Sequence, residues 1–115
     1  MLTIYGIKNC DTMKKAMAWL DQHGIEYQFH DYKKSGVPLQ RLQAWLARAG
    51  WETLVNRRGP TFRKLPPERQ NIADAAAAVA LLEQFPSAIK RPVIEAGTEL
   101  LVGYDPDEYT RVFGK

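Results

Sequence analysis

Residues 3–15 read Thr-Ile-Tyr-Gly-Ile-Lys-Asn-Cys-Asp-Thr-Met-Lys-Lys, which predicts a strand, a turn and a helix in direct succession. Residues 2–5 are mostly β-branched, aromatic or apolar, as is typical of a buried strand. Gly6 and Asn9 favour the turn that follows this strand. Apolar residues then recur at every third or fourth position, so we expect a helix over residues 11–22.

Cys10 is the only cysteine, and the pattern places it at or beside the N-terminus of this helix. The first N–H groups of a helix have no intrahelical partner, and the helix dipole is positive at that end. Both features stabilise a thiolate, so they lower the pKa of a cysteine and make it nucleophilic. The alternative is a small apolar core residue, which is less typical of a strand-to-helix turn with Lys8, Lys14 and Lys15 nearby.

The length and composition predict one globular domain, since the chain has 115 residues, of which 45% are hydrophobic and 25% charged. We expect no membrane association, because no apolar run is long enough to span a bilayer and no signal segment precedes the first strand. A single cysteine forms no intramolecular disulfide, which fits a reducing cytosol and predicts a cytoplasmic protein. A net charge of +3 and a pI of about 9.1 favour small anions or an acidic partner and are too low to indicate nucleic acid binding.

The predicted elements follow the order β-α-β, a helical middle and β-β-α, which is an α/β fold. Apolar spacing, caps and β-branched runs predict strands over 25–30, 92–95 and 99–103, a helix over 38–49, a helix over 75–85 capped by Asp74, and a last helix capped by Asp105. We expect a polar turn region over 31–38, a basic loop over 56–60 and irregular chain over 61–70, in which Pro66-Pro67 favours a helix start. Segments 1–31 and 86–115 are expected to share one four-stranded mixed sheet, with 32–85 as a helical insertion.

Three motifs carry a family resemblance. They are residues 3–10 ending in the cysteine, residues 56–65 (Asn-Arg-Arg-Gly-Pro-Thr-Phe-Arg-Lys-Leu) and residues 86–93 (Pro-Ser-Ala-Ile-Lys-Arg-Pro-Val). In this order they resemble the arsenate reductase family of the glutathione/glutaredoxin type, with its Spx and YffB-like relatives, over essentially the whole chain. The resemblance is strongest to the YffB-like glutathione-dependent thiol reductases. It implies a thioredoxin-like fold and a cis bond between Arg91 and Pro92 that faces the cysteine.

The resemblance also implies a role for each matching residue. Cys10 is expected to be the nucleophile, and Arg91 to bind an anionic substrate or a glutathione carboxylate. Pro92 is expected to shape the substrate cleft. The basic loop supplies a second arginine, where Arg57 and Arg58 match almost equally well and Arg57 is preferred.

Three neighbours of Cys10 are further candidates for the site. Lys8 either binds a glutathione carboxylate or only flanks the turn, and Asn9 and Thr12 are placed to donate hydrogen bonds to the sulfur. Neither histidine has a ligand-like spacing to the cysteine, so we expect no metal site.

Three positions depart from the relatives. The arsenate reductases carry a histidine where this chain has Gly6, and a third arginine where it reads Val-Gly-Tyr over 102–104. Recognition of arsenate benefits from several forked donors, so this loss weakens the arsenate interpretation. The Spx proteins carry a second cysteine where this chain has Met13, which excludes an intramolecular disulfide switch.

The sequence therefore predicts a glutathione-dependent thiol-disulfide oxidoreductase that acts on a thiol, a disulfide or a small anion. We expect a monomer with no tightly bound cofactor, which uses glutathione as a co-substrate because a lone thiol needs an outside thiol to resolve its mixed disulfide. Arsenate reduction is one alternative. A second is an Spx-like regulator that docks on RNA polymerase through the insertion, and a third is a structural domain with an inert thiol.

Overall fold

The chain consists of two compact units, and we describe residues 2–114 of a computed structural model. The first unit combines Met1–Ser35 with Arg91–Lys115, and the second is Gly36–Lys90. Both borders of the second unit lie a few residues further along the chain than the borders predicted for the insertion. Each unit is described by itself below.

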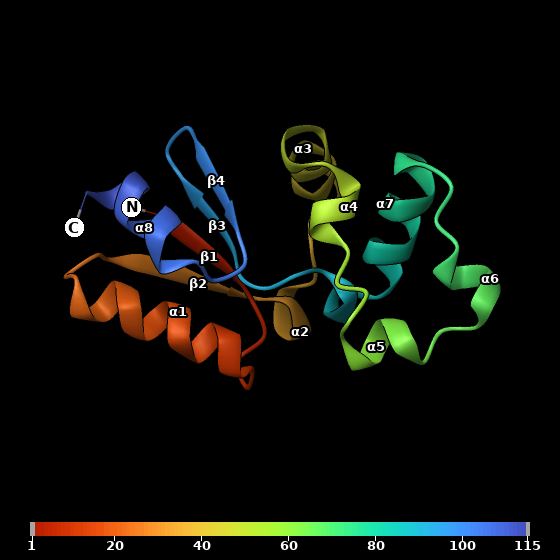
Figure 1. Cartoon of the computed structure of the whole chain (residues 1–115), viewed down its shortest axis with the longest axis horizontal. Helices are drawn as coiled ribbons and strands as arrows, with labels where there is room; N and C mark the ends of the chain where they lie inside the picture. The colour runs from red at the N-terminus through yellow and green to blue at the C-terminus, as the bar shows by residue number, and fades with distance from the viewer. Residues whose placement is uncertain (1, 115) are drawn as a thin grey trace. The chain divides into compact units, whose positions relative to one another are not determined.

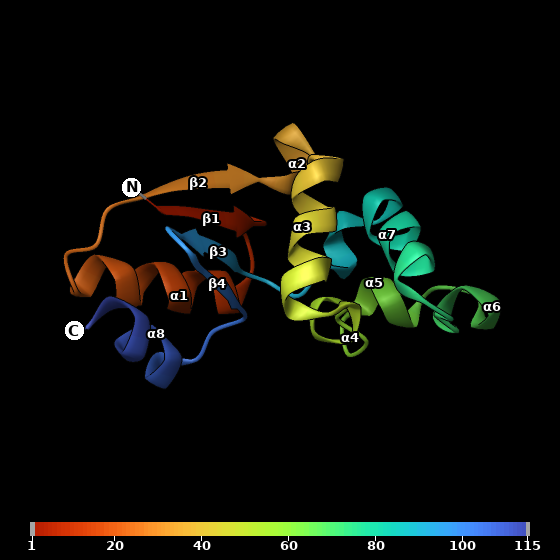
Figure 2. The same ribbon diagram turned by 90° about the horizontal axis from the view of Figure 1, so that it is seen from above.

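The first unit contains the predicted four-stranded mixed sheet, which is confirmed (Figure 2). Its strands are β1 (Leu2–Gly6), β2 (Tyr27–Asp31), β3 (Val93–Ala96) and β4 (Glu99–Val102), in the order β2-β1-β3-β4. β1 pairs in parallel with β2, and β3 pairs antiparallel with both β1 and β4. The C-terminal end of β1 therefore lies beside the start of β3, which sets the position of the residues that precede β3.

Two helices of this unit, α1 (Asp11–Gln22) and α8 (Pro106–Phe113), pack on one face of the sheet (Figure 1). The buried core between them and the strands consists of Leu2, Ile4, Met13, Ala16, Trp19, Leu20, Ile94, Leu101 and Tyr109. Asp105 caps α8 as predicted, because its Oδ1 accepts the backbone N–H of Asp107 at 3.1 Å. The helical spacing of α1 thus buries Met13, Ala16 and Leu20 as the pattern indicated, whereas Met17 of the same stripe is half-buried and Trp19 is buried.

The prediction that the second strand begins at Ile25 was wrong, because the backbone N–H of Ile25 caps the C-terminal end of α1. Gly24 adopts φ +68° after the helix, and its N–H donates to Asp21 O at 3.2 Å. The Ile25 N–H donates to Leu20 O at 2.9 Å, so both bonds of a Schellman cap are formed. Ile25 is therefore part of the helix cap, and β2 begins at Tyr27.

The predicted turn region after β2 instead contains a short helix, α2 (Tyr32–Ser35). Asp31 Oδ1 accepts the Lys33 N–H at 2.9 Å and so caps the first turn of this helix. The buried aromatic ring of Tyr32 holds it against the unit, with only 3% of the residue exposed. A single turn is too short to show a helical period in the sequence, which is why the pattern was missed.

The second unit is helical (Figure 1). Its elements are α3 (Leu39–Ala49), α4 (Trp51–Leu54), α5 (Pro60–Arg63), α6 (Pro67–Gln70), α7 (Ala75–Gln84) and the 3₁₀ turn η1 (Pro86–Ala88). Asp74 caps α7 as predicted, since its side chain accepts the Ala77 N–H at 2.9 Å. The region predicted to be a basic loop and irregular chain contains the short helices α5 and α6, each of which begins at a proline.

We expect Gly6→Ala to destabilise the protein by about 1–3 kcal/mol, because the added methyl group overpacks the core. A Cβ on Gly6 would collide with Sδ and Cε of Met13, whose side chain is fully buried. Urea unfolding followed by circular dichroism measures the loss. Met13→Val, which shortens the side chain, is expected to recover part of it in the double variant. A Gly6→Ala protein as stable as the parent would contradict this account of the Gly6–Met13 contact.

Candidate functional site

Cys10 is the N-cap residue of α1, so its predicted placement at the start of the helix is confirmed. Its backbone is extended, with φ −123° and ψ 130°, and its carbonyl oxygen accepts the Lys14 N–H at 3.0 Å. The side chain is partly exposed. The backbone N–H groups of Thr12 and Met13 are directed toward the sulfur and lower the pKa of the thiol, although neither forms a cap hydrogen bond by geometry. These are N–H groups that the first turn of a helix leaves without intrahelical partners.

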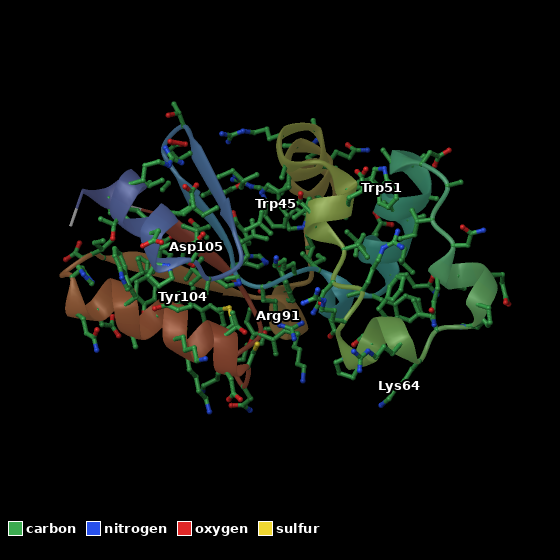
Figure 3. The ribbon with its side chains drawn as sticks, viewed as in Figure 1. Trp45, Trp51, Lys64, Arg91, Tyr104 and Asp105 are labelled. Atoms are coloured by element: carbon green, nitrogen blue, oxygen red, sulfur yellow. The ribbon has the colours of Figure 1, made fainter. Side chains whose placement is uncertain are left out.

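Arg91 lies across from this thiol and donates a hydrogen bond from Nε to Cys10 Sγ over 3.5 Å (Figure 3). The two residues are far apart in the chain, and strand pairing brings them together. Tyr5 of β1 is opposite Val93 of β3, so the turn after β1 and the residues before β3 are neighbours. Arg91 immediately precedes the segment that leads into β3, which is the neighbour of β1 on the side away from β2. The guanidinium group therefore reaches the sulfur from the β3 side of β1.

The pKa of the Cys10 thiol is lowered by its surroundings. Partial burial acts in the opposite direction and raises the pKa, because a charged thiolate loses solvent. The Arg91 hydrogen bond, the Met13 N–H, the Arg91 charge and the Thr12 N–H together outweigh that effect. The thiolate is thus stabilised by both the helix N-terminus and the arginine, which is the combination that makes a cysteine nucleophilic.

The peptide bond between Arg91 and Pro92 is cis, as the family resemblance implied. Pro92 is fully buried, and its carbonyl oxygen accepts the Gly103 N–H at 2.8 Å, just beyond β4. Arg91 itself is only half-buried. The strand start is therefore held by its neighbours in the sheet while the arginine side chain before it is directed to the sulfur.

The other predicted site residues of the first unit lie in the same turn as Cys10. Lys8 and Asn9 are exposed between β1 and α1, and Thr12 is half-buried in the first turn of α1. Within residues 2–114 the Asn9 and Thr12 side chains form no hydrogen bond with the sulfur, which the backbone N–H of Thr12 contacts instead. The roles assigned to these three residues stay predictions.

The second predicted arginine belongs to the other unit. The Arg57 guanidinium lies 5.7 Å from the ring centre of Trp51 and 5.8 Å from that of Phe62. Two such cation–π contacts hold the side chain against aromatic surface. Arg58 is exposed, and its backbone N–H donates to Asn56 Oδ1 at 3.3 Å. The choice between Arg57 and Arg58 as an anion ligand stays a prediction.

Sequence reasoning missed Tyr32, which lies close enough to Arg91 for the guanidinium charge to act on its hydroxyl group. Burial strongly raises the pKa of Tyr32, and Arg91 offsets part of this increase. Among the residues that the structure describes, nothing hydrogen-bonds to its buried hydroxyl oxygen. The only signal in the sequence was an aromatic residue inside an otherwise polar run, which was interpreted as a turn.

Two searches of residues 2–114 gave negative results. No cluster of histidine, cysteine and carboxylate side chains is arranged to hold a metal ion within this part of the chain. No helix in the same range is long and apolar enough to cross a membrane.

The sheet order and the two helices on one face define a thioredoxin-like fold, with the single cysteine at the N-terminus of the first helix. The chain belongs to the ArsC family, whose model matches residues 5–112. Both the fold class and the family predicted from the sequence are confirmed.

Three similar proteins illustrate the breadth of this family. A solved structure of a YffB protein has 50% sequence identity and a TM-score of 0.93, covering 96% of this chain and 97% of its own. An arsenate reductase (ArsC)-related protein of Brucella melitensis has 53% identity and a TM-score of 0.76, covering 97% and 93% respectively. The global transcriptional regulator Spx of Streptococcus pneumoniae is 28% identical over 110 residues, which are 94% of this chain and 82% of Spx.

Proposed function

We propose that this protein is a glutathione-dependent thiol reductase of the cytosol, with Cys10 as its nucleophile. The observation that carries the proposal is the 3.5 Å hydrogen bond from Arg91 Nε to Cys10 Sγ, at the N-cap residue of α1. A thiolate prepared in this way reacts with disulfides near neutral pH. The family includes reductases and a regulator, so the reaction and its thiol co-substrate are our inference.

The reaction consists of two thiol–disulfide exchanges. The Cys10 thiolate attacks the glutathione sulfur of a mixed disulfide between glutathione and a substrate thiol. The substrate leaves as a thiolate and takes a proton from solvent, while Cys10 becomes bonded to glutathione. The thiolate of a second glutathione then attacks the glutathione sulfur of this Cys10–glutathione disulfide. The attack releases glutathione disulfide and restores the Cys10 thiolate. Two electrons pass from glutathione to the substrate sulfur, and each exchange forms one S–S bond as it breaks another.

The neighbouring groups suit an anionic substrate. Arg91 donates to the sulfur, and the positive charge of its guanidinium group suits a carboxylate of glutathione or of the substrate. Lys8 is exposed in the adjacent turn, where its ammonium group suits a second carboxylate. Asn9 and Thr12 flank Cys10 in the chain, Pro92 directly follows Arg91, and Arg57 of the second unit stays a predicted ligand of the anion.

Two departures from the arsenate reductases support a thiol substrate over arsenate. Where the arsenate reductases have a third arginine, this chain has residues that pack in the first unit. Gly103 is buried at φ +85°, and the Tyr104 ring packs edge-on against Tyr109 at 5.4 Å. Gly6 leaves no space for a histidine, because Met13 fills the volume beside it. These positions serve the core of the first unit, so they provide no forked donors to a compact oxyanion.

The alkylation rate of Cys10 as a function of pH tests the proposal. We expect the thiol to titrate below the ordinary pKa of cysteine, so that iodoacetamide reacts at pH 7 faster than with an unstructured cysteine peptide. Because Arg91 lowers the pKa, Arg91→Gln should shift the profile to higher pH, whereas Lys90→Gln removes the adjacent charge without removing the bond to sulfur. Intact mass measures the alkylated fraction.

Turnover completes that test. The parent protein is expected to reduce a glutathionylated peptide with glutathione, glutathione reductase and NADPH as the coupling system. A Cys10 thiol that titrates at or above the ordinary pKa of cysteine would contradict the proposed reaction. So would a protein that becomes glutathionylated at Cys10 and is not reduced again by glutathione.

The similarity to Spx supports a second candidate, in which the chain regulates transcription by binding a protein partner. That function would survive Cys10→Ser, since binding through another surface needs no thiolate. A genetic complementation assay with the Cys10→Ser chain separates the two: retained activity favours the regulator, and lost activity favours the reductase.

A further inference from the structure

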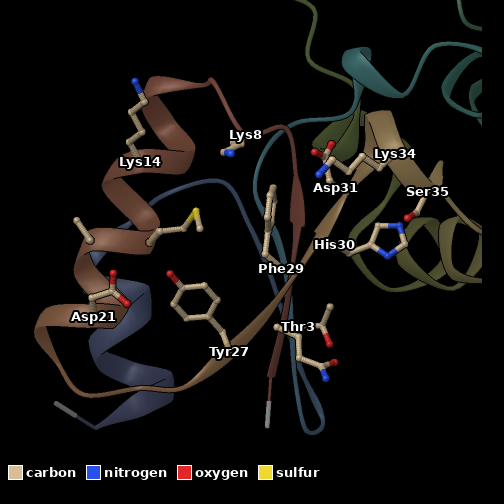
Figure 4. Close-up of a pocket in the computed structure, with 13 residues that line it drawn as sticks. Thr3, Lys8, Lys14, Asp21, Tyr27, Phe29, His30, Asp31, Lys34 and Ser35 are labelled. Atoms are coloured by element: carbon tan, nitrogen blue, oxygen red, sulfur yellow. The ribbon is translucent and has the colours of Figure 1, made fainter.

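A groove of about 890 Å³ runs between α1 and β2 in the first unit (Figure 4). Lys14 and Met17 line it on the helix, and Tyr27 and Phe29 line it on the strand. β2 is at the edge of the sheet, with β1 on one side and no strand on the other side among the described residues. An edge strand presents unpaired backbone N–H and C=O groups, which an extended peptide can bind. We call this hollow the α1–β2 groove.

The base of the α1–β2 groove is apolar. Met17, Tyr27 and Phe29 are each half-buried and pack against the core of this unit on their inner side. Their outer surface faces the hollow between the helix and the strand (Figure 4). A concave apolar surface with polar groups at its ends is the usual form of a ligand site.

The charges around the groove are unequally distributed. Lys8, Lys14 and Lys34 all line it, and none of them forms an ion pair within residues 2–114. Lys8 and Lys14 lie toward one end, and Asp21 and Tyr27 toward the other (Figure 4). Asp31 also lies at this lysine end, with Lys8 and Lys34, but the three lysines outnumber it, and the excess positive charge favours carboxylates.

The two carboxylates in the lining are already bonded within the protein. Asp21 accepts a hydrogen bond from the Tyr27 hydroxyl, and Asp31 Oδ1 accepts the Lys33 N–H at 2.9 Å. Neither carboxylate is within ion-pair distance of a groove lysine in the described part of the chain. The lysines are therefore available to an acidic ligand.

The lysine end is also the end nearest to the nucleophile. Lys8 precedes Cys10 by two residues, and the Lys14 N–H donates to the Cys10 carbonyl oxygen at 3.0 Å. With 12 residues in α1 and 5 in β2, both walls are roughly 17–18 Å long. That length accommodates about five residues of extended chain.

We propose that the α1–β2 groove binds an extended acidic polypeptide segment that flanks the substrate cysteine, so that the preferred substrates are glutathionylated proteins with acidic and apolar residues beside the modified cysteine. This inference rests on the proposed function for its chemistry, whereas the binding itself does not require a reactive thiol. The charge of the free lysines selects the carboxylates, the apolar base selects the residues between them, and the open edge of β2 favours an extended backbone.

Binding is tested without chemistry. The Cys10→Ser protein is titrated with the peptide Ser-Glu-Leu-Asp-Phe-Glu-Ile and with a matched peptide in which lysine replaces each acidic residue. Amide chemical shifts report the location, and we expect changes along α1 and β2 with at least about tenfold tighter binding of the acidic peptide, weakening as salt rises. Equal affinity for both peptides, shifts confined to other elements, or dimerisation through β2 would overturn the proposal.

Kinetics connect the groove to turnover. Lys34→Glu is expected to slow reduction of the acidic glutathionylated peptide by about three- to tenfold at low salt and to leave the reduction of a small neutral disulfide unchanged. Lys15→Glu is the matched control, since Lys15 carries the same charge on α1 but lies outside the groove lining. An equal loss in both variants would overturn the proposal, because it would indicate a nonspecific charge effect.

The two proposals fail separately. If the acidic peptide binds along α1 and β2 but the parent protein turns over no disulfide, the groove inference stands and the proposed reaction fails. If small disulfides are reduced but the acidic peptide has no advantage over the basic one, the reaction stands and the groove inference fails.

Discussion

Replacing Cys10 by serine is expected to lower glutathione-coupled disulfide reduction by more than about a thousandfold, because the hydroxyl group forms no thiolate and no mixed disulfide. The side chain is only partly buried, so the free energy of unfolding should stay within about 1 kcal/mol of the parent value. Turnover of a glutathionylated peptide measures the first effect, and urea unfolding followed by circular dichroism measures the second.

The same variant has a signature in the pH dependence of stability. The folded protein holds the Cys10 pKa below its ordinary value, so the unfolded chain binds more protons between the two pKa values. The parent should therefore gain stability as pH rises from the folded to the unfolded pKa, and lose it again as pH falls through the folded pKa. Cys10→Ser should lack this gain.

Asp11→Asn provides the matched control, since Asp11 is the exposed residue next to the nucleophile and has no proposed chemical role. We expect its turnover to stay within about twofold of the parent, because an exposed charge in high dielectric changes the pKa of its neighbour little. Substantial turnover in Cys10→Ser would remove Cys10 from the mechanism.

Tyr109→Ala is expected to destabilise the first unit by about 3–5 kcal/mol, which is a large share of the total stability of a small domain. Only 1% of Tyr109 is exposed. Its ring meets Trp19 of α1 edge-on at 5.3 Å and Phe113 of its own helix at 6.2 Å, so its loss removes a contact that holds α8 to α1. The urea midpoint, followed by circular dichroism, measures the loss.

Tyr109→Phe separates the ring from the hydroxyl group. The hydroxyl donates to Gly103 O at 2.8 Å, and its removal leaves that carbonyl oxygen without this donor, at a cost of about 1 kcal/mol. The phenylalanine variant should therefore retain most of the stability that the alanine variant loses. If both variants lost the same amount, the hydrogen bond rather than ring packing would be the source of the stabilisation.

Local chemistry in the sequence predicted much of the first unit. The helix over 11–22 has the bounds that its apolar spacing indicated, and the acidic caps at Asp74 and Asp105 lie where the pattern placed them. These features depend on interactions within a few residues, which a single segment contains in full. The two wrong predictions also have local causes. Ile25 was assigned to a strand but belongs to the Schellman cap of α1, and Tyr32 was assigned to a turn but begins a one-turn helix.

What the sequence by itself determined was the position of the cysteine at the start of a helix, because the turn and the helix N-terminus are adjacent in the chain. Tertiary structure alone decided what faces that sulfur. The antiparallel pairing of β3 with β1 brings Arg91 to 3.5 Å from Cys10 Sγ, across 81 positions of sequence. The same folding opens a lysine-rimmed groove between α1 and β2. Neither follows from local patterns, since strand order and side-chain direction depend on how the whole core packs.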